Sequence, residues 1–180
     1  AFIGCCAIAL FNLDGIKGQA PRIDVTTLVD LDESKAQEFA AETGRQAFTS
    51  LTTALEQGEF DAVDIMLPHD LHEVVATQCF EAGKHVLLEK PMSSELTACD
   101  RILGAAKDAG TTFMVAENAQ YWPEVEIAQE AIAEGAIGEV VTARVQLFFP
   151  PMPQYYGGEK PWRMNRDAAG GGLSIDTGSH

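Results

Sequence analysis

Two stretches of the chain combine residue types that could carry out chemistry. The first is Glu89-Lys90-Pro91, where a carboxylate and an amine directly follow the apolar run Val86–Leu88. The second is a run of three glycines followed by Asp176 and His180. Asp176 and His180 are four positions apart, so on a helix they would share one face, where the acid can orient the imidazole as a general base. The ordinary alternatives are a surface lysine and a glycine-rich loop carrying a solvated Asp–His pair.

The position of Lys90 after a buried strand favours the chemical interpretation. Val86–Leu88 has the length and apolar content of a strand that is buried on both faces of a parallel sheet. In an open α/β sheet the ligand crevice lies at the carboxyl ends of the strands. Pro91 then ends the strand, because proline lacks a backbone N–H and fixes φ. We therefore expect Glu89 and Lys90 to lie at the edge of a binding crevice.

The first strand-to-helix turn resembles a dinucleotide-binding turn, G-x-G-x-x-G/A. Gly4 and Ala9 fit this pattern, but Cys6 occupies the middle position, where its side chain could crowd the pyrophosphate. Asp30 lies 21 residues after Ala9, where an acid accepts hydrogen bonds from the ribose hydroxyls of the adenosine. Its charge would repel a 2′-phosphate and so favours NAD over NADP. The alternative is an acid in a solvated loop.

The segment Pro68-His69-Asp70-Leu71-His72 ends another expected strand at the same edge. We expect Pro68 and His69 to contact a cofactor. For His72, a helix-start residue that makes local hydrogen bonds is at least as good an interpretation. No third ligand lies at a metal-binding spacing, so no metal site is predicted.

Strand and helix patterns alternate along the chain, which predicts an α/β fold with a mostly parallel sheet. Gly44 is expected to end one helix, and Ser93 or Ser94 to cap a later one. The expected strands are Phe2–Ile3, Asp24–Val29, Gln46–Phe48, Ala62–Leu67, Val86–Leu88 and Thr112–Ala116. The expected helices cover about residues 7–17, 33–43, 50–57, 71–79, 96–106 and 123–134.

The pattern changes near residue 136. After it, Val140–Phe149 alternates between apolar and polar residues, as expected for a strand of an antiparallel sheet. We therefore expect residues 1–136 to form a first domain and residues 137–180 to begin a second one. Both ends of the chain look cut, because Ala1 starts in the tail of a strand and the chain stops straight after a glycine-rich motif. We interpret the sequence as a fragment of a longer protein.

Composition narrows the classes of partner. The formal net charge is -15 at pH 7, which disfavours nucleic acids and anionic membranes as partners. No apolar run reaches the ~18 residues that a membrane span needs. The four cysteines form no C-x-x-C pair, and Cys79 and Cys99 fall on apolar faces of expected helices, which favours reduced core thiols and a cytoplasmic location. A small-molecule substrate is the expected partner.

The motifs, in their order and spacing, resemble the Gfo/Idh/MocA oxidoreductases, which are the glucose–fructose oxidoreductase and inositol 2-dehydrogenase-like proteins. The resemblance covers essentially the whole chain. The segments that carry it are Gly4–Ala9, Ala62–Ile65 with Pro68 and His72, Gly83–Val86 with Glu89-Lys90-Pro91, Asn118, Ala136–Val140, and Gly170–Gly172 with Asp176 and His180.

The resemblance implies a Rossmann dinucleotide-binding domain followed by the start of an α+β domain with a mostly antiparallel sheet. It also implies that Lys90 touches the reacting hydroxyl, that His180 is the acid/base with Asp176 beside it, and that the full-length protein is a homo-oligomer. Trp162 and Arg163 resemble a pair that lies near the cofactor in one branch of the family, although a loop aromatic packed under an arginine is an equal alternative. The expected cofactor-binding residues are Gly4, Cys6, Ala7, Ile8, Asp30, Pro68, His69, Glu89, Lys90, Asn118, Trp162 and Arg163.

The leading hypothesis for function is NAD-dependent hydride transfer at a hydroxyl carbon of a sugar or polyol. A second hypothesis keeps the fold but uses bound NAD for redox-assisted hydrolysis or for transfer between two sugars. A third is a non-catalytic protein that binds a dinucleotide or another ligand and acts in regulation, and the unusual Cys6 makes this idea less remote.

Overall fold

A single six-stranded parallel sheet forms the centre of the molecule. The computed structural model describes residues 1–20, 22–146, 148 and 161–178. The strand order is β3-β2-β1-β4-β5-β6, so the chain winds outward from β1 in both directions, as in a Rossmann fold. The predicted α/β fold with a parallel sheet is confirmed. The strands are β1 (Phe2–Ile3), β2 (Thr27–Val29), β3 (Gln46–Phe48), β4 (Ala62–Ile65), β5 (His85–Leu88) and β6 (Phe113–Val115).

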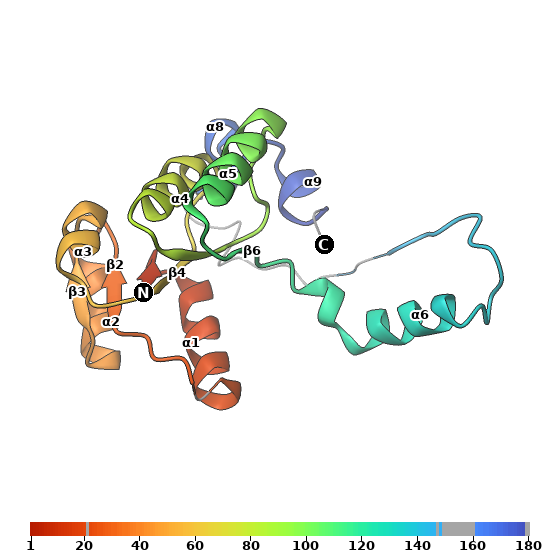
Figure 1. Ribbon diagram of the computed structural model, residues 1–180, viewed down its shortest axis with the longest axis horizontal. Coiled ribbons are helices and arrows are strands. Elements are labelled where there is room, and N and C mark those ends of the chain that lie inside the picture. The colour runs from red at the N-terminus through yellow and green to blue at the C-terminus, as the bar shows by residue number, and fades with distance from the viewer. Residues whose placement is uncertain (21, 147, 149–160, 179–180) are drawn as a thin grey trace.

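Helices cover both faces of the sheet. The longer ones are α1 (Ala7–Gln19), α2 (Glu33–Thr43), α3 (Leu51–Gln57), α4 (His72–Glu81), α5 (Leu96–Ala109) and α6 (Pro123–Ala133). The short ones are η1 (His69–Leu71), η2 (Ala119–Tyr121), η3 (Trp162–Met164), α8 (Arg166–Ala169) and α9 (Leu173–Asp176). One core packs α3, α4 and α5 against the sheet, and a second core packs α1 and α2 against the other face (Figure 1). None of the helices in the described ranges is long and apolar enough to cross a membrane.

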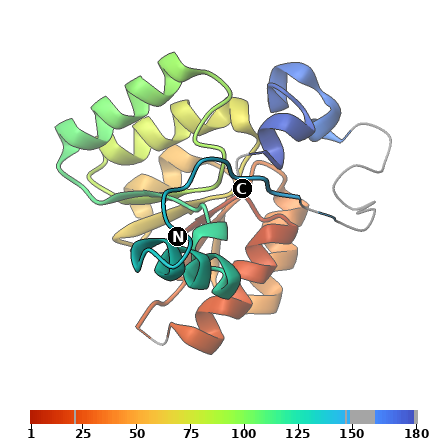
Figure 2. The same cartoon turned by 90° about the vertical axis from the view of Figure 1, so that its right-hand side faces the viewer.

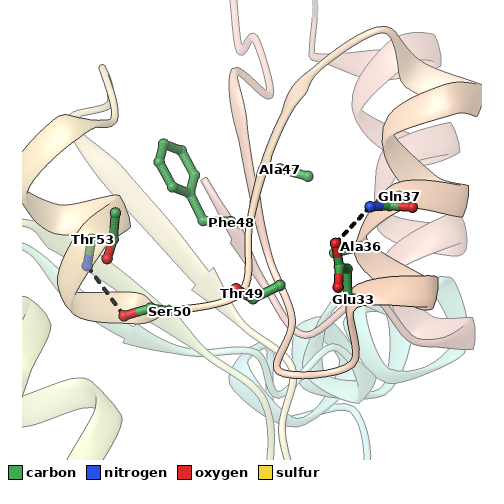
Figure 3. A pocket seen from close by; sticks show the side chains of 8 residues that line it. All are labelled: Glu33, Ala36, Gln37, Ala47, Phe48, Thr49, Ser50 and Thr53. Atoms are coloured by element: carbon green, nitrogen blue, oxygen red, sulfur yellow. Dashed lines mark hydrogen bonds between the residues drawn. The ribbon is translucent and has the colours of Figure 1, made fainter.

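Local sequence signals explain where several helices begin and end. The Asp32 side chain accepts a hydrogen bond from the N–H of Ser34 and caps α2, which ends at Gly44 with φ 70°. Ser50 caps α3 by accepting the N–H of Thr53 (Figure 3). The predicted cap of α5 by Ser93 or Ser94 is wrong. The N-cap is Glu95, which makes no side-chain capping bond, and the Ser93 hydroxyl accepts the N–H of Glu95 two residues before the helix cap could form.

The predicted strand Val140–Phe149 is not found in the part of it that the structure describes. Residues 140–146 and 148 have no strand conformation, and Val141 and Val145 are 91% and 81% exposed. Alternation specifies a strand only where a neighbouring strand satisfies its backbone groups, and none of the described strands pairs with this segment. Helix α6 has no buried residue, and it leads away from the sheet (Figure 1). The domain boundary near residue 136 stays a prediction.

Candidate active site

The parallel sheet brings most of the predicted site residues to one edge. Because all six strands run in the same direction, their carboxyl ends meet at the same edge of the sheet. The residues that follow these ends are Gly4 after β1, Asp30 after β2, Pro68 and His69 after β4, Glu89 and Lys90 after β5, and Asn118 after β6.

The turn between β1 and α1 requires a glycine at its first position. Gly4 has φ +101°, a conformation that L side chains rarely adopt, and a Cβ there would overlap the carbonyl oxygen of Met66. Its N–H donates to the Val29 carbonyl at 2.8 Å. Helix α1 then begins at Ala7, so the first N–H groups of the helix, including those of Ala7 and Ile8, have no preceding carbonyl within the helix. Such a helix start can bind a pyrophosphate.

Asp30 is held beside this turn by two backbone donors. Its Oδ2 atom accepts the N–H of Cys5 at 2.8 Å, and its Oδ1 atom accepts the N–H of Asp32 at 2.9 Å. A carboxylate offers about four acceptor positions, so two remain for the hydroxyls of a ribose. The residues of the turn and Asp30 therefore fit the adenosine and pyrophosphate parts of a dinucleotide.

The backbone at Cys6 does not need a glycine. Cys6 has φ −111° and ψ −179°, an extended conformation that any residue adopts. The Sγ atom lies 3.6 Å from the carbonyl oxygen of Met66, and the residue is exposed. The departure from the glycine pattern therefore causes no backbone strain, and its effect on pyrophosphate binding stays a prediction.

Lys90 and Asp176 meet across 86 positions of the sequence. The Lys90 Nζ atom donates to the Asp176 Oδ1 atom at 3.1 Å and to the Asp176 carbonyl oxygen at 2.5 Å. The Arg163 Nε atom donates to the Asp176 Oδ2 atom at 3.1 Å. The Asp176 side chain is only 8% exposed, so these are charge-assisted contacts with little competition from water. Asp176 is therefore a counter-ion that Lys90 and Arg163 share.

His180 lies outside the described residues, so its predicted pairing with Asp176 stays a prediction. The short helix α9 ends at Asp176, and residues 177 and 178 form a turn. The role of His180 as the acid/base stays a prediction.

His69 and Trp162 close the other side of this group. His69 is 3% exposed, and its Nδ1 atom lies 3.0 Å from the Ala169 carbonyl oxygen. Its Nε2 atom lies 4.0 Å from the Asp176 Oδ1 atom, and its ring meets Trp162 edge-on with centroids 4.8 Å apart. Burial lowers the pKa of His69, against the opposing effects of the Ala169 carbonyl and Asp176. The Arg163 guanidinium lies 4.3 Å from the centre of the Trp162 ring.

A close backbone contact holds this segment against the sheet edge. Gly170 has φ 79°, and a Cβ there would overlap the Cβ of Ser94, in the loop that follows Lys90. Helix α8, which is capped by Asn165, packs against η1. Figure 2 shows α8 and α9 beside the loop that leads into α5. The glycine-rich motif therefore lets residues 161–178 approach closely enough for Asp176 to reach Lys90.

Glu89, which precedes Lys90, and Asp64 on β4 have raised pKa values. Burial, helped by the nearby Asp64, raises the pKa of Glu89 to about 7, and a Glu89 carboxylate oxygen accepts the N–H of Lys90 at 3.1 Å. Burial raises the pKa of Asp64 on β4 to about 6. The Asp64 Oδ2 atom accepts a hydrogen bond from Asn12 at 2.9 Å, whereas its Oδ1 atom has no partner among the described residues. Asp64 and Asn12 are not among the predicted site residues, although an acid inside an apolar strand is a usable signal.

Asn118 and a pocket on the β3 side of the sheet lie apart from this group. Asn118 is exposed, and among the described residues its side chain forms no hydrogen bond to Lys90 or Asp176. A pocket of about 270 Å³ lies between α2, β3 and α3, lined by residues such as Phe48 and Thr53 (Figure 3). It contains none of the predicted site residues, and three strands separate β3 from β5. We therefore place the candidate active site at Lys90 and not in this pocket.

Named relatives of the chain act on sugars and related compounds. The chain is 29% identical over 160 residues to 1,5-anhydro-D-fructose reductase from Ensifer adhaerens, covering 87% of this chain and 46% of the relative. It is 28% identical over 166 residues to levoglucosan dehydrogenase from Pseudarthrobacter phenanthrenivorans, covering 89% and 42%. The chain thus spans about half the length of the curated relatives that it matches.

Solved structures show the same fold with nicotinamide cofactors. A 3-ketoreductase from Actinomadura kijaniata, in complex with TDP-benzene and NADP, matches with a TM-score of 0.83 and 28% identity over 97% of this chain and 52% of that one. The WlbA dehydrogenase from Bordetella pertussis, in complex with NADH and UDP-GlcNAcA, matches with a TM-score of 0.74 and 28% identity over 76% of this chain and 42% of that one.

Two family models cover nearly the whole chain. The model of the oxidoreductase family with an NAD-binding Rossmann fold matches residues 1–117, and the GFO/IDH/MocA C-terminal domain model matches residues 125–180. The first match alone covers more than half of the chain, and it coincides with the parallel sheet and the glycine turn. The chain therefore belongs to the GFO/IDH/MocA family of oxidoreductases.

Proposed function

We propose that the whole protein is an NAD(P)-dependent oxidoreductase that transfers hydride between nicotinamide and a hydroxyl or carbonyl carbon of a sugar, polyol or related compound. The observation that carries this proposal is the Lys90–Asp176 pair, which lies at the same sheet edge as the glycine turn and Asp30. The names of the relatives, which include a reductase and a dehydrogenase of sugar derivatives, support the class of substrate.

Lys90 is suited to stabilise charge on a reacting oxygen. A lysine ammonium has three N–H donors, and Asp176 accepts two of them through its carbonyl oxygen and Oδ1 atom. The third donor can bind the oxygen of the substrate and stabilise the alkoxide that develops as hydride leaves carbon. A bound nicotinamide supplies the hydride acceptor. Asp176 keeps the ammonium oriented, since both contacts come from one residue with an 8% exposed side chain.

The remaining roles follow from the chemistry of the residues. In this proposal His180 takes the hydroxyl proton, since histidine is the side chain that most often acts as a general base. Asp30 binds the adenosine ribose and selects NAD over NADP by repelling a 2′-phosphate. Pro68, His69, Glu89, Asn118, Trp162 and Arg163 are proposed to line the cofactor crevice. We also propose that the whole protein is a homo-oligomer and that it is located in the cytoplasm.

A titration of the whole protein with NADH and NADPH tests the cofactor assignment. We expect NADH to bind more tightly, and Asp30→Asn to reduce the difference, because it removes the charge that repels the 2′-phosphate. Asp14→Asn, at an exposed position of α1, is the matched control and should leave both affinities unchanged.

A panel of sugars, polyols and their keto derivatives then tests the reaction by the absorbance of reduced nicotinamide. Net conversion of added NAD separates a dehydrogenase from an enzyme that recycles bound NAD within one turnover. If neither dinucleotide binds, the proposal is wrong, and a regulatory protein on the same fold takes its place.

A further inference from the structure

His72 lies between the two segments that carry the candidate catalytic group. It is the first residue of α4, and its side chain is fully buried, with 0% exposure. Its Nδ1 atom lies 2.9 Å from the carbonyl oxygen of Pro91, and its Nε2 atom lies 3.0 Å from the carbonyl oxygen of Leu67. Both ring nitrogens are therefore within hydrogen-bond distance of a backbone oxygen.

The two carbonyl groups belong to different parts of the chain. Leu67 follows β4 and directly precedes Pro68 and His69, whereas Pro91 directly follows Lys90. A neutral imidazole carries one N–H and donates to one of two such carbonyls, and only the doubly protonated ring donates to both. Burial lowers the pKa of His72, which favours the neutral ring. With its one N–H the neutral ring donates to one of the two carbonyls, and donation to Pro91 ties the loop that follows Lys90 to the start of α4, five positions after Leu67.

This arrangement sets the distance between Lys90 and His69, two of the three side chains within 4.0 Å of the Asp176 carboxylate among the described residues. Lys90 lies directly before Pro91, and His69 lies two positions after Leu67. The Lys90 Nζ atom lies 3.1 Å and the His69 Nε2 atom 4.0 Å from the Asp176 Oδ1 atom. A lysine side chain loses much rotamer freedom when it is held in one place, so its backbone must be well ordered. A hydrogen bond from the buried His72 ring to the Pro91 carbonyl provides that order.

We propose that His72 is a positioning residue, which donates to the Pro91 carbonyl from the start of α4 and thereby holds Lys90 and His69 at fixed places around Asp176. Its catalytic consequence rests on the proposed function, but the link between His72 and Lys90 exists without any substrate or cofactor. The His72 side chain has no exposed surface that a substrate or cofactor could contact, so it is not itself a catalytic residue.

The test follows Lys90 in the whole protein labelled with ¹³C,¹⁵N-lysine, with the Lys90 signal assigned by its loss in Lys90→Arg. His72→Phe keeps a flat ring but removes both nitrogens, and His72→Gln restores one donor. Val74→Ala is the control, because Val74 lies on the same helix and is 50% exposed. Hydrogen exchange of the backbone at Lys90 and Met92 is measured in the same samples.

In His72→Phe we expect the side-chain signal of Lys90 to move toward those of the exposed Lys35 and Lys107. Backbone exchange should become about tenfold faster, the change that corresponds to one lost hydrogen bond of ~1.4 kcal/mol. His72→Gln should recover part of both effects, which a purely space-filling role would not produce. Val74→Ala should match the wild type.

A folded His72→Phe protein whose Lys90 signal and exchange rates equal those of Val74→Ala would overturn the proposal. If His72→Phe does not fold, His72→Gln decides: an intermediate shift of the Lys90 signal supports the proposal, and an unchanged signal overturns it. Failure of NADH to bind the wild-type protein would contradict the proposed function and leave this result unaffected, so the two failures are distinguishable.

Discussion

Replacing Asp176 with asparagine removes the charge that Lys90 and Arg163 share while keeping the size of the side chain. The asparagine Oδ1 atom can still accept a hydrogen bond from Lys90, and the backbone contact to the Asp176 carbonyl is unaffected. The new amide group, however, is a donor, and it faces the Arg163 Nε–H, which lies 3.1 Å from the Oδ2 atom in the wild type. The substitution therefore leaves two cations without their common anion.

The size of the effect follows from how far these groups are buried. The side chains of Asp176, Lys90 and Arg163 are 8%, 17% and 23% exposed. Removing one partner of a buried ion pair costs roughly 3–5 kcal/mol. Because one acceptor and the backbone contact remain, we expect a loss of about 2–3 kcal/mol in the free energy of unfolding. For a chain of this size that corresponds to a decrease in Tm of about 4–12 °C.

Thermal unfolding of the wild type, Asp176→Asn and Asp167→Asn measures this directly. Asp167 is an exposed acid in the same segment, so Asp167→Asn should change the free energy of unfolding by no more than about 0.5 kcal/mol. Equal Tm values for Asp176→Asn and Asp167→Asn would show that the shared counter-ion contributes nothing to stability, and the reasoning from burial and contact distances would be refuted.

Two further substitutions test other parts of the site. The pKa of Asp64 is about 6 in the folded protein, above the ordinary 3.8, so its contribution to stability is present below pH 3.8 and is lost as pH rises through 6. Asp64→Asn should remove this pH dependence of the free energy of unfolding, which is worth up to ~3 kcal/mol. Urea unfolding of both proteins at several pH values measures it, and parallel pH profiles of the free energy of unfolding would contradict the prediction. Gly4→Ala should destabilise the protein by at least ~2 kcal/mol and weaken NADH binding, because its Cβ meets the Met66 carbonyl. Gly15→Ala in α1, where a Cβ meets nothing, should be neutral or stabilising, and equal behaviour of the two alanine variants would show that the turn tolerates a side chain.

Local patterns predict the sheet and most of its helices well. Helix α2 and strand β3 have the predicted bounds. The apolar spacing of Ala36 and Phe39 indicates the helix, and Gly44 marks its end, shortly before the strand begins. The place of Asp30 beside the glycine turn also follows from the sequence, because parallel strands must bring their carboxyl ends together.

The partners of Asp176 could not be predicted in this way. Its contact with Lys90 joins residues 86 positions apart, and no local spacing reports such a pair. The same applies to the bridge that His72 makes to Pro91, and to the burial of Asp64, which depend on how the segments pack. The prediction of a strand from Val140 is wrong in its described part for a related reason, because a strand needs a partner strand that its own sequence does not specify.

The most direct test of the proposed chemistry compares Lys90→Met with Lys107→Met in the whole protein. Lys107 is exposed near the end of α5, so its replacement controls for the loss of one positive charge. With a substrate found in the sugar and polyol panel, the two measurements are NADH affinity and the rate of hydride transfer.

We predict that Lys90→Met reduces the transfer rate by at least ~100-fold, the size expected when one donor to a developing oxyanion is removed, while NADH still binds. Lys107→Met should match the wild type in both measurements. Hydride transfer by Lys90→Met at the wild-type rate would contradict the assignment of Lys90 to the reacting oxygen.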